Sequence, residues 1–164
     1  MIYQVTGDIL KSKAQAIAHG VAPNDHFAQG LAHSLREMWP AMYKDYRHYY
    51  QSQHPESGNA WMWGTTEGKR IINLLTQEPA KDERSNPGKA TVSHVNHALK
   101  ELRKLIEKEG IKSVALPKLA TGVGGLKWEE VFPLVQKHLG DLNIPVYVYT
   151  VYQKDVEAQE PKPH

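Results

Sequence analysis

Residues 113–128 read Ser-Val-Ala-Leu-Pro-Lys-Leu-Ala-Thr-Gly-Val-Gly-Gly-Leu-Lys-Trp, and this stretch decides the fold. The apolar run Ser113–Leu116 is typical of a buried strand, and a helical pattern begins at Trp128. The glycine-rich segment Thr121–Gly125 therefore joins a strand to a helix, which is where ligands bind in open α/β sheets. Its backbone N–H groups and the helix dipole favour an anion such as a phosphate. The alternative is a plain connection that needs a flexible backbone, and the glycine spacing fits neither the dinucleotide fingerprint nor the Walker loop.

The rest of the chain also alternates strands with helices. Short apolar runs predict strands at residues 2–5, 14–21, 59–65, 69–76, 113–116 and 145–151. Apolar residues at helical spacing predict helices from residue 30 to the proline at 40, after that proline, at 91–109 and at 128–138. The strands at 59–65 and 69–76 are expected to form a hairpin. This order of elements predicts an α/β fold with a largely parallel sheet and helices on both faces.

Composition excludes several functional classes. A chain of 164 residues suits one domain, and it has no cysteine for a disulfide, a thiolate metal site or a cysteine nucleophile. The formal net charge of +2, with both signs interspersed, disfavours nucleic acid as the main ligand. The first residues do not form a signal peptide, and no window approaches the about 18 apolar residues of a membrane span. We therefore expect a soluble, cytoplasmic monomer with no membrane attachment.

Two further polar segments follow predicted strands. Asn24, Asp25 and His26 come after the strand at 14–21 and before a helix, so they should open on the same side of the sheet as the glycine-rich segment. Their side chains suit a sugar site, although Asn and Asp also favour ordinary turns. Asp8 follows the first strand, and a carboxylate there can accept a hydrogen bond from the exocyclic amine of a purine.

Together these segments resemble the macrodomain family. The resemblance covers residues 1–151 in order and rests on Gly7-Asp8-Ile9-Leu10, His19-Gly20-Val21, Gly30-Leu31-Ala32 and the run from Leu116 to Gly125. Residues 126–131 and 144–150 are similar to the branch of the terminal ADP-ribose protein glycohydrolase and the ADP-ribose-1″-phosphate phosphatase. The resemblance implies a three-layer α/β/α fold with a mixed sheet of six strands. Residues 152–164 are polar and proline-bearing, and we expect them to form a flexible tail.

The resemblance further implies a site for ADP-ribose across the strand ends. Asp8 would accept the adenine amine, the Ile9 N–H would face the purine, and Thr121–Gly125 would wrap the diphosphate. The segment 24–30 would flank the distal ribose. The implied ligand-binding residues are Asp8, Ile9, Gly20, Gln29, Gly30, Thr121, Gly122, Val123, Gly124 and Gly125. We expect neither a cofactor nor a metal.

Two positions depart from the family pattern. The glycohydrolase relatives have a lysine near the position of Gln77 and an aspartate where this chain has Gly124. A lysine-adduct mechanism is therefore not expected. The ligand's own diphosphate would instead position a water, with Asp25 or His26 as the base. These two residues and the adjacent Asn24 are the candidate catalytic residues.

Three functions remain open. The first is hydrolysis of ADP-ribosyl linkages on a protein or on an ADP-ribose derivative, and the second is a reader that binds ADP-ribose without turnover. The third is single-stranded nucleic-acid binding by the aromatic and basic stretch Tyr43–Tyr50, although such a helix more often buries its tyrosine rings. The nine histidines include no His-Glu-x-x-His pattern, so we expect structural or surface roles for them.

Overall fold

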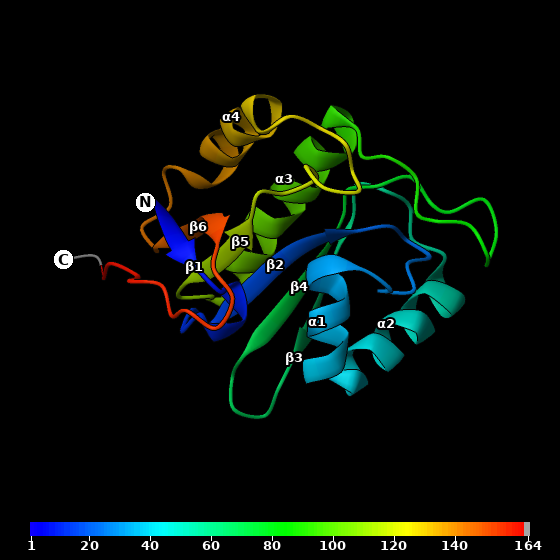
Figure 1. The fold of residues 1–164 in the computed structure, drawn as a ribbon, viewed down its shortest axis with the longest axis horizontal. Helices are drawn as coiled ribbons and strands as arrows, with labels where there is room; N and C mark the ends of the chain where they lie inside the picture. Colours follow the sequence, from blue (N-terminus) through cyan, green and yellow to red (C-terminus); the bar gives the residue numbers. More distant parts are fainter. Residues whose placement is uncertain (163–164) are drawn as a thin grey trace.

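The computed structural model describes residues 1–162 and contains one six-stranded mixed sheet (Figure 1). The strand order is β1-β6-β5-β2-β4-β3, and every neighbouring pair is parallel except β4 and β3. The strands are β1 (Ile2–Gly7), β2 (Ala16–Val21), β3 (Ala60–Gly64), β4 (Arg70–Leu75), β5 (Val114–Pro117) and β6 (Val146–Tyr152). The predicted strands and the hairpin are therefore confirmed, with boundaries shifted by one or two residues.

Four α-helices cover the two faces of the sheet. They are α1 (Gly30–Met38), α2 (Pro40–Gln53), α3 (Val92–Glu109) and α4 (Trp128–Leu139). Helices α3 and α4 lie on one face and α1 and α2 on the other (Figure 1). A short 3₁₀ turn, η1 (Ile9–Lys11), follows β1. The predicted three-layer α/β/α arrangement is confirmed.

Each face of the sheet has its own core because alternate strand residues point to opposite sides. Ala18 and Ile72 belong to the core under α3 and α4, whereas Ile17 and Ile71 belong to the core under α1 and α2. Strand β4 is buried along Ile71–Leu75, as expected for a strand covered on both faces. A sheet packed on both sides leaves the strand ends as the place for a ligand.

Helix α3 shows why the boundaries were predictable. The Thr91 side chain accepts a hydrogen bond from the His94 N–H, which caps the first turn, and Gly110 ends the helix in a left-handed conformation with φ of 63°. The apolar stripe begins one turn later than its sequence spacing indicates, because Val92 is 42% exposed whereas Val95 is buried.

The residues after β6 differ from the expected flexible tail. Residues 153–161, here called the C-terminal strap, run alongside β1 and η1 (Figure 1). The Gly7 carbonyl accepts a hydrogen bond from the Gln153 N–H at 3.1 Å, and Ala158 is buried in the core under α1 and α2. The Glu160 carboxylate accepts hydrogen bonds from the Ser12 and Tyr149 hydroxyls. The polar composition of this segment therefore did not indicate the hydrogen bonds that anchor it. Residues 163–164 of the expected tail lie outside the described residues.

Within residues 1–162, none of the helices combines the length and the hydropathy that crossing a bilayer requires.

Candidate functional site

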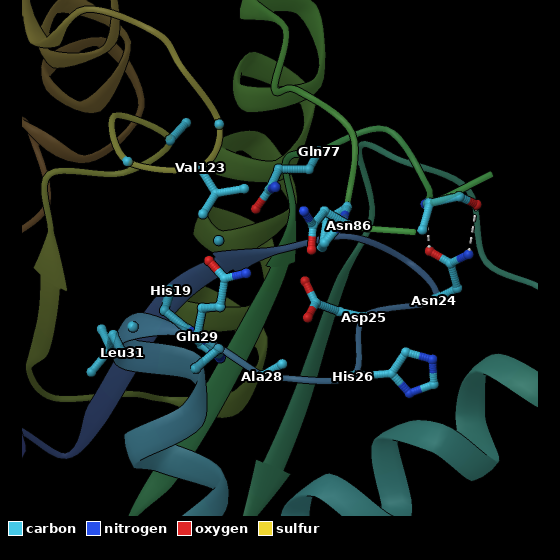
Figure 2. Close-up of a pocket in the computed structure, with 18 of the residues that line it drawn as sticks. His19, Asn24, Asp25, His26, Ala28, Gln29, Leu31, Gln77, Asn86 and Val123 are labelled. Carbon is cyan, nitrogen blue, oxygen red and sulfur yellow. Dashed lines mark hydrogen bonds between the residues drawn. The ribbon is translucent and has the colours of Figure 1, made fainter. Parts of the chain in front are cut away.

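A cavity of about 590 Å³ lies at the carboxyl ends of β2, β4 and β5 (Figure 2). Three connections surround it: residues 22–29 after β2, residues 76–91 after β4, and the glycine-rich loop 118–127 after β5. They meet because the strands are parallel and therefore end at the same edge of the sheet. The expectation that the first and third connections open on one side of the sheet is confirmed.

Nine of the candidate catalytic and ligand-binding residues line this cavity. They are Gly20, Asn24, Asp25, His26, Gln29, Gly30, Gly122, Val123 and Gly124. Their individual roles remain predictions. Thr121 and Gly125 belong to the same loop but are outside the cavity wall, and the Thr121 hydroxyl donates to the Lys118 carbonyl at 2.8 Å.

The glycine-rich loop is held in a shape that leaves donors free. Its ends are closed by a hydrogen bond from the Leu126 N–H to the Ala120 carbonyl at 2.9 Å. Within the described residues, the backbone N–H groups of Gly122, Val123 and Gly124 donate no hydrogen bond. A β-carbon on Gly124 would lie 2.7 Å from the Ala120 carbonyl oxygen, so this turn requires glycine, whereas Gly122 has open space beside it.

A second group of free donors faces the same cavity. Gly30, Leu31 and Ala32 form the first turn of α1 and line the cavity. Gln29, the residue before the helix, makes no side-chain hydrogen bond to that turn, so the N–H groups of the turn are uncapped. The helix dipole adds partial positive charge at this end. Two convergent sets of backbone donors suit an anion with several oxygens, such as a diphosphate.

Asp25 is the most buried carboxylate of the cavity wall. It is 8% exposed, and its two oxygens accept hydrogen bonds from the Phe27 N–H at 2.8 Å and the Ala22 N–H at 3.0 Å. Burial raises the pKa of Asp25; the two N–H donors and the nearby His26 and Arg47 oppose that rise. The result is a fixed carboxylate that binds a proton more readily than an ordinary aspartate.

Helices α1 and α2 hold the loop that carries Asp25. Arg36 donates to the His26 carbonyl at 2.8 Å, and Arg47 donates to the Asn24 carbonyl at 3.0 Å. Phe27 adopts a left-handed backbone with φ of 53° and is fully buried, which locks the turn in place. The His26 ring turns toward α2, where its Nδ1 lies 3.5 Å from the Tyr43 hydroxyl (Figure 2).

The long connection after β4 forms the outer wall, which sequence reasoning did not assign. The Asn24 side chain pairs with the Ala80 backbone, donating to its carbonyl at 2.9 Å and accepting from its N–H at 2.8 Å (Figure 2). Gln77 donates to the Gly88 carbonyl at 3.0 Å and extends into the cavity. Residues 83–87 of the same connection complete the wall. Its length was the available signal, because long loops in compact domains are usually functional.

Asp8 and Ile9 are not part of this cavity wall. Asp8 is 3% exposed, and its carboxylate accepts from the Leu10 N–H at 3.0 Å and from the Asp155 N–H at 2.9 Å. Each Asp8 oxygen already accepts one backbone hydrogen bond. The predicted bond from the adenine amine must therefore use a second lone pair of one of these oxygens.

The Tyr43–Tyr50 stretch is largely engaged in packing. Tyr46 is fully buried, Tyr49 stacks on Trp61 with ring centroids 5.2 Å apart, and the Arg36 guanidinium covers the Tyr43 ring at 4.0 Å. These contacts use the ring faces that a stacked nucleobase would need. The described residues also contain no group of three His, Cys, Asp or Glu side chains arranged to hold a metal ion.

The Macro domain family model matches residues 22–135, which include both donor sets and the loop of Asp25. This chain belongs to the Macro domain family. It is 26% identical over 166 residues to the DNA ADP-ribosyl transferase–DNA ADP-ribosyl glycohydrolase fusion protein of Thermosipho africanus, which covers 93% of this chain and 42% of the relative. The chain thus spans less than half the length of that curated relative.

Solved macrodomains have the same fold. The macrodomain of Thermus aquaticus DarG superposes with a TM-score of 0.79 at 25% identity, covering 92% of this chain and 98% of that one. A structure of Thermosipho africanus DarTG in complex with ADP-ribose gives a TM-score of 0.79 at 22% identity, covering 95% of this chain and 42% of that one.

Proposed function

We propose that this protein binds ADP-ribose in the cavity and hydrolyses an ADP-ribosyl linkage. The observation that carries the proposal is the convergence of the free N–H groups of Gly122–Gly124 with the uncapped first turn of α1. These donors suit the diphosphate, which leaves the distal ribose beside Asp25. Membership of the Macro domain family and the likeness to ADP-ribosyl glycohydrolases support the same ligand.

In the proposed mechanism, Asp25 is the base. Its carboxylate takes a proton from a water held beside the anomeric carbon of the distal ribose, and the water oxygen bonds to that carbon. The bond from the carbon to the attached group breaks, and that group leaves with the bonding electrons. Protonated Asp25 then returns its proton to the leaving atom or, where the leaving group is a carboxylate, to solvent. The raised pKa of Asp25 moves it toward the range in which a general base works best. With Gln77 and Gly124 at the lysine and aspartate positions, no lysine adduct forms at that site.

Binding is tested by replacing Gly122. The β-carbon of a glutamate there meets no atom within 4 Å, and the side chain places a carboxylate beside the phosphate donors. Calorimetry with ADP-ribose should give a Kd of about micromolar for the wild type and for Gly122→Ala, and no binding for Gly122→Glu. Unchanged affinity in Gly122→Glu would remove the cavity from consideration.

The attached group is tested by turnover. We propose that the substrate carries ADP-ribose on DNA or on a protein side chain, and the name of the Thermosipho africanus relative, which includes a DNA ADP-ribosyl glycohydrolase, supports including DNA. The wild type and Asp25→Asn are compared on ADP-ribosylated oligonucleotides and on peptides ADP-ribosylated at glutamate, aspartate or serine. Release of ADP-ribose from one substrate class, lost in Asp25→Asn, supports hydrolysis.

A non-catalytic reader is the second candidate. It is favoured by the carboxylate of Asp25, both of whose oxygens already accept backbone hydrogen bonds, and by the amide of Gln77 in place of a lysine. Micromolar ADP-ribose binding without turnover of any of these substrates would select the reader.

A further inference from the structure

A buried histidine beneath the cavity has a ring nitrogen with no hydrogen-bond partner among residues 1–162. His19 on β2 is the register partner of Asn73 on β4, and both side chains lie on the face covered by α1 and α2. His19 is 2% exposed, and the Phe27 ring packs edge-on against it at 5.6 Å. Its Nε2 lies 2.6 Å from Asn73 Oδ1.

The neighbours of His19 favour one tautomer of its ring. The Asn73 Nδ2 group is directed at the sulfur of Met42, 3.9 Å away, which leaves Oδ1 facing the imidazole. An amide oxygen only accepts hydrogen bonds, so the proton of the ring is on Nε2. Burial lowers the pKa of His19 to about 4, so the ring is neutral near pH 7. Nδ1 is then an unprotonated acceptor.

We infer that this acceptor borders the cavity. Nδ1 makes no hydrogen bond within residues 1–162, and the one fully enclosed, unpartnered side-chain atom among them is the Thr76 hydroxyl oxygen. His19 Nδ1 is therefore not sealed in the core. The residue forms part of the cavity wall, near Gln29 and Leu31 of the α1 entrance (Figure 2).

The polarity of this nitrogen selects its partner. The surrounding backbone N–H groups of Gly122–Gly124 and α1 are donors suited to phosphate oxygens, which only accept at neutral pH. An unprotonated imidazole nitrogen repels such oxygens and requires a donor. We propose that His19 is a specificity-determining residue whose Nδ1 accepts a hydrogen bond from a hydroxyl group in the cavity, either a ribose hydroxyl of the ligand or a water that the ligand orders. This proposal rests on the proposed function, because it takes ADP-ribose as the ligand.

The first experiment compares ADP-ribose with ADP, which lacks the distal ribose, in calorimetry. Loss of one hydrogen bond should weaken ADP-ribose binding to His19→Phe by about 3- to 10-fold. A loss confined to ADP-ribose assigns the partner as a distal ribose hydroxyl. An equal loss for ADP assigns a water or a group common to both ligands. Unchanged affinity for both ligands overturns the inference and leaves the proposed function standing.

Two variants separate this role from a structural one. His19→Asn keeps a polar atom near the position of Nδ1 and should bind ADP-ribose more tightly than His19→Phe. Asn73→Leu leaves His19 in place but removes the acceptor that holds the proton on Nε2, so the proton can move to Nδ1 and turn the acceptor into a donor. Asn73 does not line the cavity, and a hydroxyl can accept as well as donate, so this variant should keep more ADP-ribose affinity than His19→Phe.

The nitrogen-15 chemical shift of His19 Nδ1 reports the hydrogen bond directly, and a purely structural role of His19 would not change this shift when the ligand binds. In the wild type the Nδ1 signal should be that of an unprotonated nitrogen, and it should shift toward a hydrogen-bonded value when ADP-ribose is added. Asn73→Leu should show a mixture of tautomers. A Nδ1 signal that ADP-ribose leaves unchanged overturns the inference even if His19→Phe fails to fold. Absence of ADP-ribose binding by the wild type overturns the proposed function and this inference together.

Discussion

The backbone N–H of Asp155 donates a hydrogen bond of 2.9 Å to the carboxylate of Asp8, which joins the C-terminal strap to the end of β1. The Asp8 N–H donates in return to the Val156 carbonyl at 2.7 Å. This reciprocal pair holds the strap across the residue that sequence reasoning assigned to the adenine amine. The strap is therefore part of the fold at this end of the sheet, and its removal should alter both stability and the environment of Asp8.

Gly7→Ala tests how much the strap stabilises the protein. Gly7 has φ of 153°, and an added β-carbon would lie 2.8 Å from the Val156 carbonyl oxygen and from the Ala158 nitrogen. We expect the free energy of unfolding to fall by about 2–3 kcal/mol, because the strap must move away from β1. The matched control is Gly68→Ala, which has φ of 97° but nothing within 4 Å, so it reports backbone strain alone. Equal losses in urea denaturation would mean that the strap contributes little.

The raised pKa of Asp25 gives the activity a defined pH dependence. The active form is the carboxylate, so the acid limb of the kcat/KM profile should have a midpoint above the ordinary value of 3.8. Asp25→Asn should lose about 10²- to 10⁴-fold in kcat. The effect of Asp25 on stability is opposite to that of a salt-bridged aspartate. Because its pKa is raised in the folded protein, Asp25 stabilises the fold below the pKa that it has in the unfolded chain, and this contribution is lost as the pH rises through its folded-state pKa. A midpoint at or below 3.8 would assign the limb to another group.

The sequence predicted the elements well because each has a local signal. Thr91 and Gly110 mark the two ends of α3, and the proline at 40 separates α1 from α2. The glycine-rich loop was found for the same reason: its position between a strand and a helix is a local property. Fold and loop could therefore be predicted without any knowledge of tertiary contacts.

The features that were missed depend on pairs far apart in the chain. Glu160 is held by Ser12 and Tyr149, and nothing near residue 160 indicates that these partners exist. Asn24 pairs with the backbone of Ala80, a contact that its polarity alone did not indicate, and its catalytic role stays a prediction. Polar residues carry this ambiguity in general, because the same side chain serves a ligand or the backbone.

Thr76→Val should stabilise the protein. The Thr76 hydroxyl is fully buried and has no hydrogen-bond partner among the described residues, and such a group costs about 1–3 kcal/mol. Valine has nearly the same shape, so the free energy of unfolding should rise by about 1 kcal/mol, whereas Thr76→Ser should give no gain. A loss of stability in Thr76→Val would show that the hydroxyl does bond to a partner, such as a buried water.

Asn24→Ala tests the contact between the two walls of the cavity. Removing the Asn24 side chain deletes both hydrogen bonds to Ala80, which should weaken the attachment of the connection 76–91 to the loop of Asn24 by about 1–2 kcal/mol. This connection contains Lys81 and Arg84, so trypsin should cleave it about 5- to 30-fold faster in the variant when opening precedes cleavage.

A second asparagine serves as the control that separates faster cleavage of this connection from a loss of stability in the whole protein. Asn59 also donates to a backbone carbonyl, that of Glu56 at 3.0 Å, but it is not part of the cavity wall. Asn59→Ala should leave the cleavage rate after Lys81 and Arg84 unchanged. If Asn24 positions the wall, Asn24→Ala should raise KM more than it lowers kcat, because the reacting groups stay in place while the closed cavity is less populated. A selective loss of kcat with normal trypsin resistance would instead return Asn24 to the catalytic role that the sequence predicted.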